Sequence, residues 1–115
     1  MDERILKWLF DIKMSIDEIE DFFKNEEKDF FFFFNNLMLK RAVERNLEII
    51  GEATNRIITR DSLFNERITN AKAIIGLRNQ VIHAYDNISD ENIWSILTNH
   101  LPKLKTEVEN LIKEE

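Results

Sequence analysis

Apolar residues recur every three or four positions along most of the chain. This spacing gathers them on one face of an α-helix, whereas alternation at every second position would indicate strands. The first predicted helix covers residues 3–24, and the second runs from Asn35 or Asn36 to about residue 59. The third begins near Thr69 or Asn70, and the fourth begins at Ser89 and extends to Leu111. Four helices joined by short connections form an antiparallel bundle, so we expect an all-α fold.

Two residues interrupt these helical patterns. Pro102 should kink or restart the last helix, because it lacks a backbone donor and crowds the preceding turn. Gly51 lies inside the second helix, where glycine costs about 1 kcal/mol relative to alanine. We therefore expect another backbone to approach closely at Gly51.

Five consecutive phenylalanines, Phe30–Phe34, fit neither a helical nor a strand period. Five adjacent aromatic side chains cannot all face one core, so some must be exposed or buried against another chain. Two interpretations stay open, namely burial in the core or a loop of the monomer, and a contact between subunits. A membrane role is less favoured, because no basic amphipathic flank accompanies the run.

Length and composition narrow the class of protein. A chain of 115 residues fits one domain, here residues 1–115. The absence of cysteine and the presence of two histidines make a protein-built metal site improbable, and no cofactor is expected. No apolar run reaches the ~18–20 residues that span a bilayer, and the first residues mix charges unlike a signal peptide. We expect a soluble cytoplasmic protein without membrane contact.

The net charge of −6 hides an uneven distribution. Basic side chains outnumber acidic ones only in residues 35–85, the middle of the chain. A positive middle can bind a phosphate backbone locally. From charge alone, helix faces that carry ordinary ion pairs are the favoured explanation.

Polar groups interrupt an apolar helix near residue 80, at Arg78, Asn79 and His83. Histidine titrates near neutrality and can act as base or acid, and arginine can clamp a phosphate with two parallel hydrogen bonds. Asn79 could orient His83 or hold a phosphate oxygen. These residue types suit cleavage of RNA without a metal. The competing interpretation pairs Arg78 with a carboxylate and packs His83 between helices.

The spacing of this cluster raises a geometric problem. Arg78 and His83 are five residues apart, so their side chains diverge by about 140° on an ideal helix. A shared site needs the long reach of arginine, or a second copy of the helix across a two-fold axis.

The segment Arg78-Asn-Gln-Val-Ile-His-Ala-Tyr85 resembles the Arg-x4-His-x-Tyr motif of the HepT toxins, a branch of the HEPN superfamily. Residues 41–53 resemble the second signature of that family, and the Trp94 to Pro102 stretch also fits. The resemblance implies a four- or five-helix HEPN-type bundle and a homodimer. It further implies an endoribonuclease site at the dimer interface, with Arg78 and His83 catalytic and Asn79 supporting them.

The resemblance also implies a partner and a modification. HepT toxins are paired, in type VII toxin–antitoxin systems, with an MntA-like nucleotidyltransferase antitoxin that transfers AMP to the tyrosine of the motif, here Tyr85. Such a modification adds bulk and negative charge beside the phosphate site. Alternatively, Tyr85 simply closes a helix end. A hypothesis of another class is a non-catalytic helical module that dimerises or binds a nucleotidyltransferase.

Several further polar residues lie outside the motif. We expect His100 at the surface or at a helix end, outside the catalytic set. Glu48 and Glu52 could pair with Arg78 or hold the dimer together. Arg41 and Arg45 share a helix face, where RNA contact and pairing with glutamates are equally compatible with the sequence.

Overall fold

The computed structural model describes residues 1–24, 30–76 and 90–114. Within these ranges the chain is helical and contains no strand, which confirms the predicted all-α fold. Residues 71–76 are helical as well. The elements are α1 (Glu3–Phe22), α2 (Phe30–Phe34), α3 (Leu37–Arg60), α4 (Phe64–Arg67), α6 (Asp90–Ser95), the π-helical turn η1 (Ile96–His100) and α7 (Leu101–Lys113).

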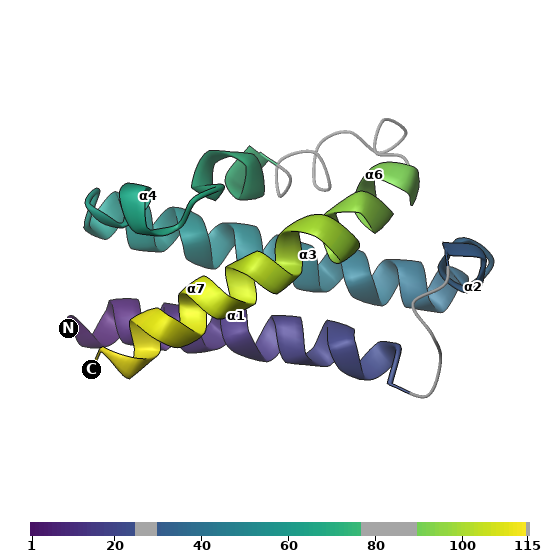
Figure 1. The fold of residues 1–115 in the computed structure, drawn as a ribbon, viewed down its shortest axis with the longest axis horizontal. Coiled ribbons are helices and arrows are strands. Elements are labelled where there is room, and N and C mark those ends of the chain that lie inside the picture. Colours follow the sequence, from purple (N-terminus) through teal and green to yellow (C-terminus); the bar gives the residue numbers. More distant parts are fainter. Residues whose placement is uncertain (25–29, 77–89, 115) are drawn as a thin grey trace.

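The two longest helices, α1 and α3, lie side by side and antiparallel, and the rod formed by α6, η1 and α7 crosses them (Figure 1). Helix α1 contacts both α3 and α7, and both chain termini lie at the same end of the molecule. The bundle thus has two layers, with α1 and α3 in one and the C-terminal rod in the other.

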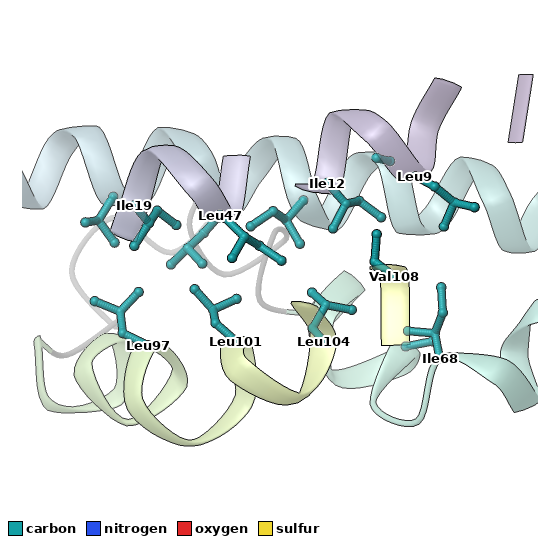
Figure 2. Packing of buried hydrophobic residues seen from close by; sticks show 14 of the residues in the cluster. Leu9, Ile12, Ile19, Leu47, Ile68, Leu97, Leu101, Leu104 and Val108 are labelled. Atoms are coloured by element: carbon teal, nitrogen blue, oxygen red, sulfur yellow. The ribbon is translucent and has the colours of Figure 1, made fainter. Parts of the chain in front are cut away.

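The core lies between these layers, where apolar side chains from α1, α3 and α7 point toward one another (Figure 2). The spacing in the sequence predicted these faces, because each helix buries the stripe on which its apolar residues recur. Burial of one large aliphatic side chain contributes about 1.5–3 kcal/mol. The largest fully buried residues are Phe33, Leu9, Ile12, Ile16, Leu47, Ile50, Ile57, Ile68, Ile93, Leu97, Val43 and Val108.

Side-chain caps set the starts of the two long helices. The Asp2 carboxylate accepts hydrogen bonds from the Arg4 and Ile5 amides at 2.8 and 3.2 Å. Asn36 accepts one from the Leu39 amide at 2.9 Å, so Asn36 rather than Asn35 caps α3. The predicted boundaries of both helices are confirmed within two residues.

The last helix restarts at Pro102, as predicted. Helix α7 begins at Leu101 with proline in its first turn, where a missing N–H leaves no bond unmade. The preceding turn is π-helical, and the Leu101 amide donates to the Ile96 carbonyl five residues earlier. Leu97 within this turn and Leu101 directly after it are both buried in the core.

The structure has a helix at Phe30–Phe34, where the spacing of the sequence shows neither a helical nor a strand period. These residues form the short helix α2, because this conformation buries Phe33 fully and packs two rings against Trp94. The ring centroids of Phe33 and Phe30 lie 5.7 and 6.1 Å from that of Trp94. Tertiary packing therefore overrides the local pattern. Phe31 and Phe34 are exposed, which confirms that the five rings do not share one core. Helix α4, a single turn, was not predicted either.

The third predicted helix is described only at its start. Its first hydrogen bond runs from the Ile74 amide to the Asn70 carbonyl at 2.9 Å, which confirms a start near Asn70. Ser89, the predicted cap of the next helix, lies outside the described residues. Gly51 is buried in α3, and a close backbone approach to it stays a prediction.

Candidate functional site

The predicted site residues Arg78, Asn79, His83 and Tyr85 all lie outside the described residues, within 77–89. The structure describes the chain on both sides of this segment and helix α3, which carries the second signature. These parts define the surroundings of the candidate site.

Both flanks of the segment are fixed to the bundle. Before it, Ile68 and Ala71 are buried, and the Thr69 amide donates to the Glu107 carboxylate of α7 at 3.1 Å. After it, Ile93 is fully buried, and Lys40 of α3 forms an ion pair with Asp90 at 3.2 Å. The chain before the segment is thus held to α7 at Thr69, and the chain after it is held to the start of α3 at Asp90.

One side of α3 connects the second signature to the ion pair with Asp90. Glu44 lies one turn and Gly51 three turns after Lys40, so all three residues share a side of the helix. Lys40 and Glu44 are only partly exposed, and Gly51 is buried. This side of α3 therefore begins with two half-buried charged residues near Asp90 and becomes buried by Gly51.

The arginines of the second signature pair with glutamates one turn away. Arg41 lies 3.0 Å from Glu44, and Arg45 lies 3.3 Å from Glu48. Both guanidinium groups are largely exposed, and exposed pairs of this kind contribute about 0–1 kcal/mol. Glutamate pairing is confirmed, and each guanidinium keeps donors with which it could still bind a phosphate.

The described partners of the two candidate glutamates also lie on α3. Glu48 pairs with Arg45, and Glu52 pairs with Arg56 at 2.7 Å. The predicted pairing of either glutamate with Arg78 involves a residue outside the described ranges.

Asn46, inside the second signature, was missed as a candidate by the sequence analysis. It is only 4% exposed, and its Nδ2 donates to the Ala42 carbonyl at 3.0 Å. Its Oδ1 is buried and has no hydrogen-bond partner among the described residues. The signal was available, because Asn46 stands three positions after Val43 and four before Ile50, on the apolar side of the helix. A buried acceptor without a partner costs about 1–3 kcal/mol, so Asn46 is a candidate for a role other than packing.

The surface between α1 and α3 holds two shallow hollows that share Arg56. One, of about 350 Å³, is lined by Trp8, Asn55, Arg56, Thr59 and Arg60. The other, of about 160 Å³, is lined by Asp11, Arg45, Ile49, Glu52, Ala53 and Arg56. Arg56 is paired with Glu52, and Arg60 with Asp2 at 3.0 Å. The carboxylates balance the arginines, so charge does not single out an anionic ligand for these hollows.

Perturbed pKa values among the described residues belong to pairs that join separate parts of the bundle or stabilise α1. Burial opposes ionisation of Asp2, but hydrogen bonds from Arg60 and from the Ile5 and Arg4 amides outweigh it and lower the pKa of this carboxyl. A hydrogen bond from Arg67 lowers the pKa of Glu114. A hydrogen bond to Asp17 raises the pKa of Lys13. These groups support the fold, and none lies in the second signature.

The remaining expectations concern His100, metals and membranes. His100 is exposed at the end of η1, which confirms its predicted position at a helix end. In the part of the chain that the structure describes, no three metal-ligating side chains gather. No described helix has both the length and the apolarity to cross a bilayer.

Comparisons with known proteins place these features in context. Residues 12–111 match the family described as Ribonuclease HepT-like. The Methanocaldococcus jannaschii protein named "Putative RNase MJ1380" is 42% identical over 112 residues, which cover 95% of this chain and 98% of that protein. A second protein of that organism, "Putative RNase MJ1216", is 35% identical and covers 99% of this chain and 93% of its own. "Putative RNase TTE0752" of Caldanaerobacter subterraneus is 32% identical over 80 residues, or 68% of this chain and 69% of its own. No solved structure matches the chain.

Proposed function

Because this chain belongs to the HepT-like ribonuclease family, we propose that it is a metal-independent endoribonuclease toxin with an active site composed from two copies. The observation that carries the proposal is the intact Arg78-x4-His83 motif in a chain that matches the family over nearly its whole length. The five-residue spacing of Arg78 and His83 supports the dimer, because on an ideal helix this spacing would not aim both groups at one phosphate.

The proposed reaction assigns each group a step. His83 of one copy removes the proton from a ribose 2′-hydroxyl, and the 2′-oxygen forms a bond to the adjacent phosphorus. The bond from phosphorus to the 5′-oxygen breaks, and His83 of the other copy supplies the proton that the leaving oxygen takes up. Arg78 stabilises the charge that develops on the phosphoryl oxygens, and Asn79 orients His83 or holds a phosphate oxygen.

We also propose a control point at Tyr85. A cognate MntA-like nucleotidyltransferase antitoxin would join the phenol oxygen to the α-phosphorus of ATP and release pyrophosphate. The added AMP carries negative charge, so it would repel an RNA phosphate beside His83. The helical module without catalysis is the alternative, in which the same residues serve dimerisation or nucleotidyltransferase binding.

An RNA cleavage assay in EDTA tests the nuclease. We expect the purified chain to cut RNA, and His83→Ala and Arg78→Ala to lower the rate at least about 100-fold, as loss of an acid–base or charge-stabilising group does. The chain offers matched controls, because His100→Ala removes an exposed histidine and Arg4→Ala removes an exposed arginine of α1, and both lie outside the two signatures. Equal cleavage by the motif variants and the controls would exclude the proposed site, and stable complex formation without cleavage would favour the binding module.

The mass of protein co-expressed with a neighbouring nucleotidyltransferase tests the modification. We expect an increment of one or more AMP units on the peptide that contains Tyr85, and no increment in Tyr85→Phe. AMP found on another peptide would contradict this assignment.

A further inference from the structure

Exposed apolar side chains gather where α2 meets α3. In the described part of the chain, Phe31, Phe34, Leu37 and Met38 are 69, 45, 63 and 84% exposed, within one stretch of eight residues. We call these four residues the α2–α3 patch. The other large exposed apolar residues described are spread over α1 and the chain near α4, namely Met1, Phe10, Met14 and Leu63.

This α2–α3 patch adjoins the end of the segment that carries the motif. Lys40 lies over the Phe34 ring, 5.2 Å from its centroid, and forms the ion pair with Asp90. On the core side of α2, Phe30 and Phe33 contact Trp94 of α6. Figure 1 shows α2 and the start of α6 at the same end of the molecule. The α2–α3 patch therefore lies beside the point where residue 90 follows the motif segment.

We propose that the α2–α3 patch is the surface through which two copies of this chain associate. The inference rests on the proposed function, because a composite site requires two motif segments to face each other, and the α2–α3 patch lies beside one end of each. An isologous contact buries the same patch on both copies, so one apolar surface covers the other.

The size of the patch fits a second copy. At about 200 Å² for each large side chain, the exposed fractions correspond to roughly 500 Å² of apolar surface per copy. A stable interface of ordinary size buries about 800 Å² on each partner, so the α2–α3 patch supplies most of its apolar centre. Two described cations beside the patch are already paired, Lys40 with Asp90 and Arg41 with Glu44, so neither opposes the approach of a second copy as an unpaired charge.

The test is the mass of the full-length chain in solution, measured by sedimentation over a range of concentrations. The double substitution Leu37→Gln with Met38→Gln, which we call the α2–α3 variant, removes the two exposed apolar side chains at the start of α3, and glutamine preserves helix propensity. We expect this variant to raise the dissociation constant of the dimer by at least about 100-fold, as loss of buried anchors in an interface does. The matched control is Phe10→Gln with Met14→Gln on α1, which removes two exposed apolar residues away from the patch. Thermal unfolding followed by circular dichroism checks that both variants fold.

Cross-linking gives a second measurement, which detects the contact between two copies without weakening the dimer. The chain has no cysteine, so Met38→Cys introduces a single thiol on each copy. We expect a short bismaleimide to join two Met38→Cys copies and to leave Met14→Cys copies unlinked. A dimer that resists linkage through position 38 would overturn the proposal.

The outcomes separate this interface from the nuclease. A dimer lost in the α2–α3 variant, with a wild-type chain that leaves RNA intact, supports the interface and refutes the nuclease. RNA cleavage by a monomeric α2–α3 variant supports the interface and refutes the composite site. A wild-type chain that stays monomeric at hundreds of micromolar refutes the interface, as does a dimer that the α2–α3 variant retains. Vesicle or nucleotidyltransferase binding through the patch without self-association refutes it too.

Discussion

At the scale of one residue, Asn46 is a polar side chain buried on the apolar side of α3. Its Nδ2 is satisfied within α3, but its Oδ1 has no partner among the described residues. Selection for packing alone would favour leucine at this position, because leucine has a similar volume and no polar atom to bury. The second signature thus keeps an amide where the fold gains little from it.

We predict that Asn46→Leu raises the free energy of unfolding by about 1 kcal/mol, because it removes a buried acceptor that has no partner among the described residues. Urea unfolding measures this change, and Asn55→Leu, at an exposed position on the same helix, should change it by less than about 0.5 kcal/mol. If RNA cleavage falls while stability rises, the amide serves the site. A loss of stability of more than about 1 kcal/mol would contradict the prediction and indicate that Oδ1 is satisfied.

At the scale of secondary-structure elements, α7 is joined to α1 by charge as well as by apolar contact. Lys105 of α7 lies 2.9 Å from Glu20 and 3.7 Å from Asp17, both on α1. The hydrogen bond to Glu20 raises the pKa of Lys105 above its ordinary value of 10.5, although partial burial opposes this. Because the amine is more basic in the folded chain, its contribution to stability is fully present below pH 10.5 and is lost as the pH rises through the folded pKa.

We therefore expect wild-type stability to fall between neutral pH and about pH 12 by more than that of Lys105→Met, which keeps the apolar stem without the charge. Thermal unfolding at a series of pH values measures both chains. Lys103→Met provides the control, because Lys103 is exposed and should leave the pH profile unchanged. Parallel profiles for wild type and Lys105→Met would show that the Lys105 pairs contribute nothing.

The elements that the sequence predicted are those whose stabilising pattern is local. Helices α1 and α3 follow from apolar spacing and a capping side chain, and both signals lie within one stretch of chain. Helix α2 depends on Trp94, some sixty residues away, so no local window predicts it. The residue types of Arg78 and His83 suggest the chemistry, but the pairing of Arg45 with Glu48 and the lack of a described partner for Asn46 Oδ1 required the fold.

At the scale of the whole molecule, the fold leaves the α2–α3 patch exposed at the end of the bundle where the motif segment returns to the core. A monomer gains nothing from exposed phenylalanine, leucine and methionine at one corner, whereas a dimer buries them. If the patch joins two copies and each copy supplies one His83, only the dimer can cleave RNA. Dilution that separates the copies should then abolish cleavage along with the dimer.

This coupling predicts how an inactive copy affects an active one. In a mixture with a ninefold excess of His83→Ala, random exchange leaves about one tenth of the wild-type copies paired with each other, so cleavage should fall to about one tenth. The triple variant His83→Ala, Leu37→Gln, Met38→Gln carries the same inactive motif but lacks the patch, so it should not inhibit. Cleavage measured after subunit exchange, at a concentration where the wild-type chain is fully dimeric, distinguishes these cases. Unchanged cleavage with the His83→Ala excess would mean that each copy holds a complete site, whereas equal inhibition by both variants would mean that association does not require Leu37 and Met38.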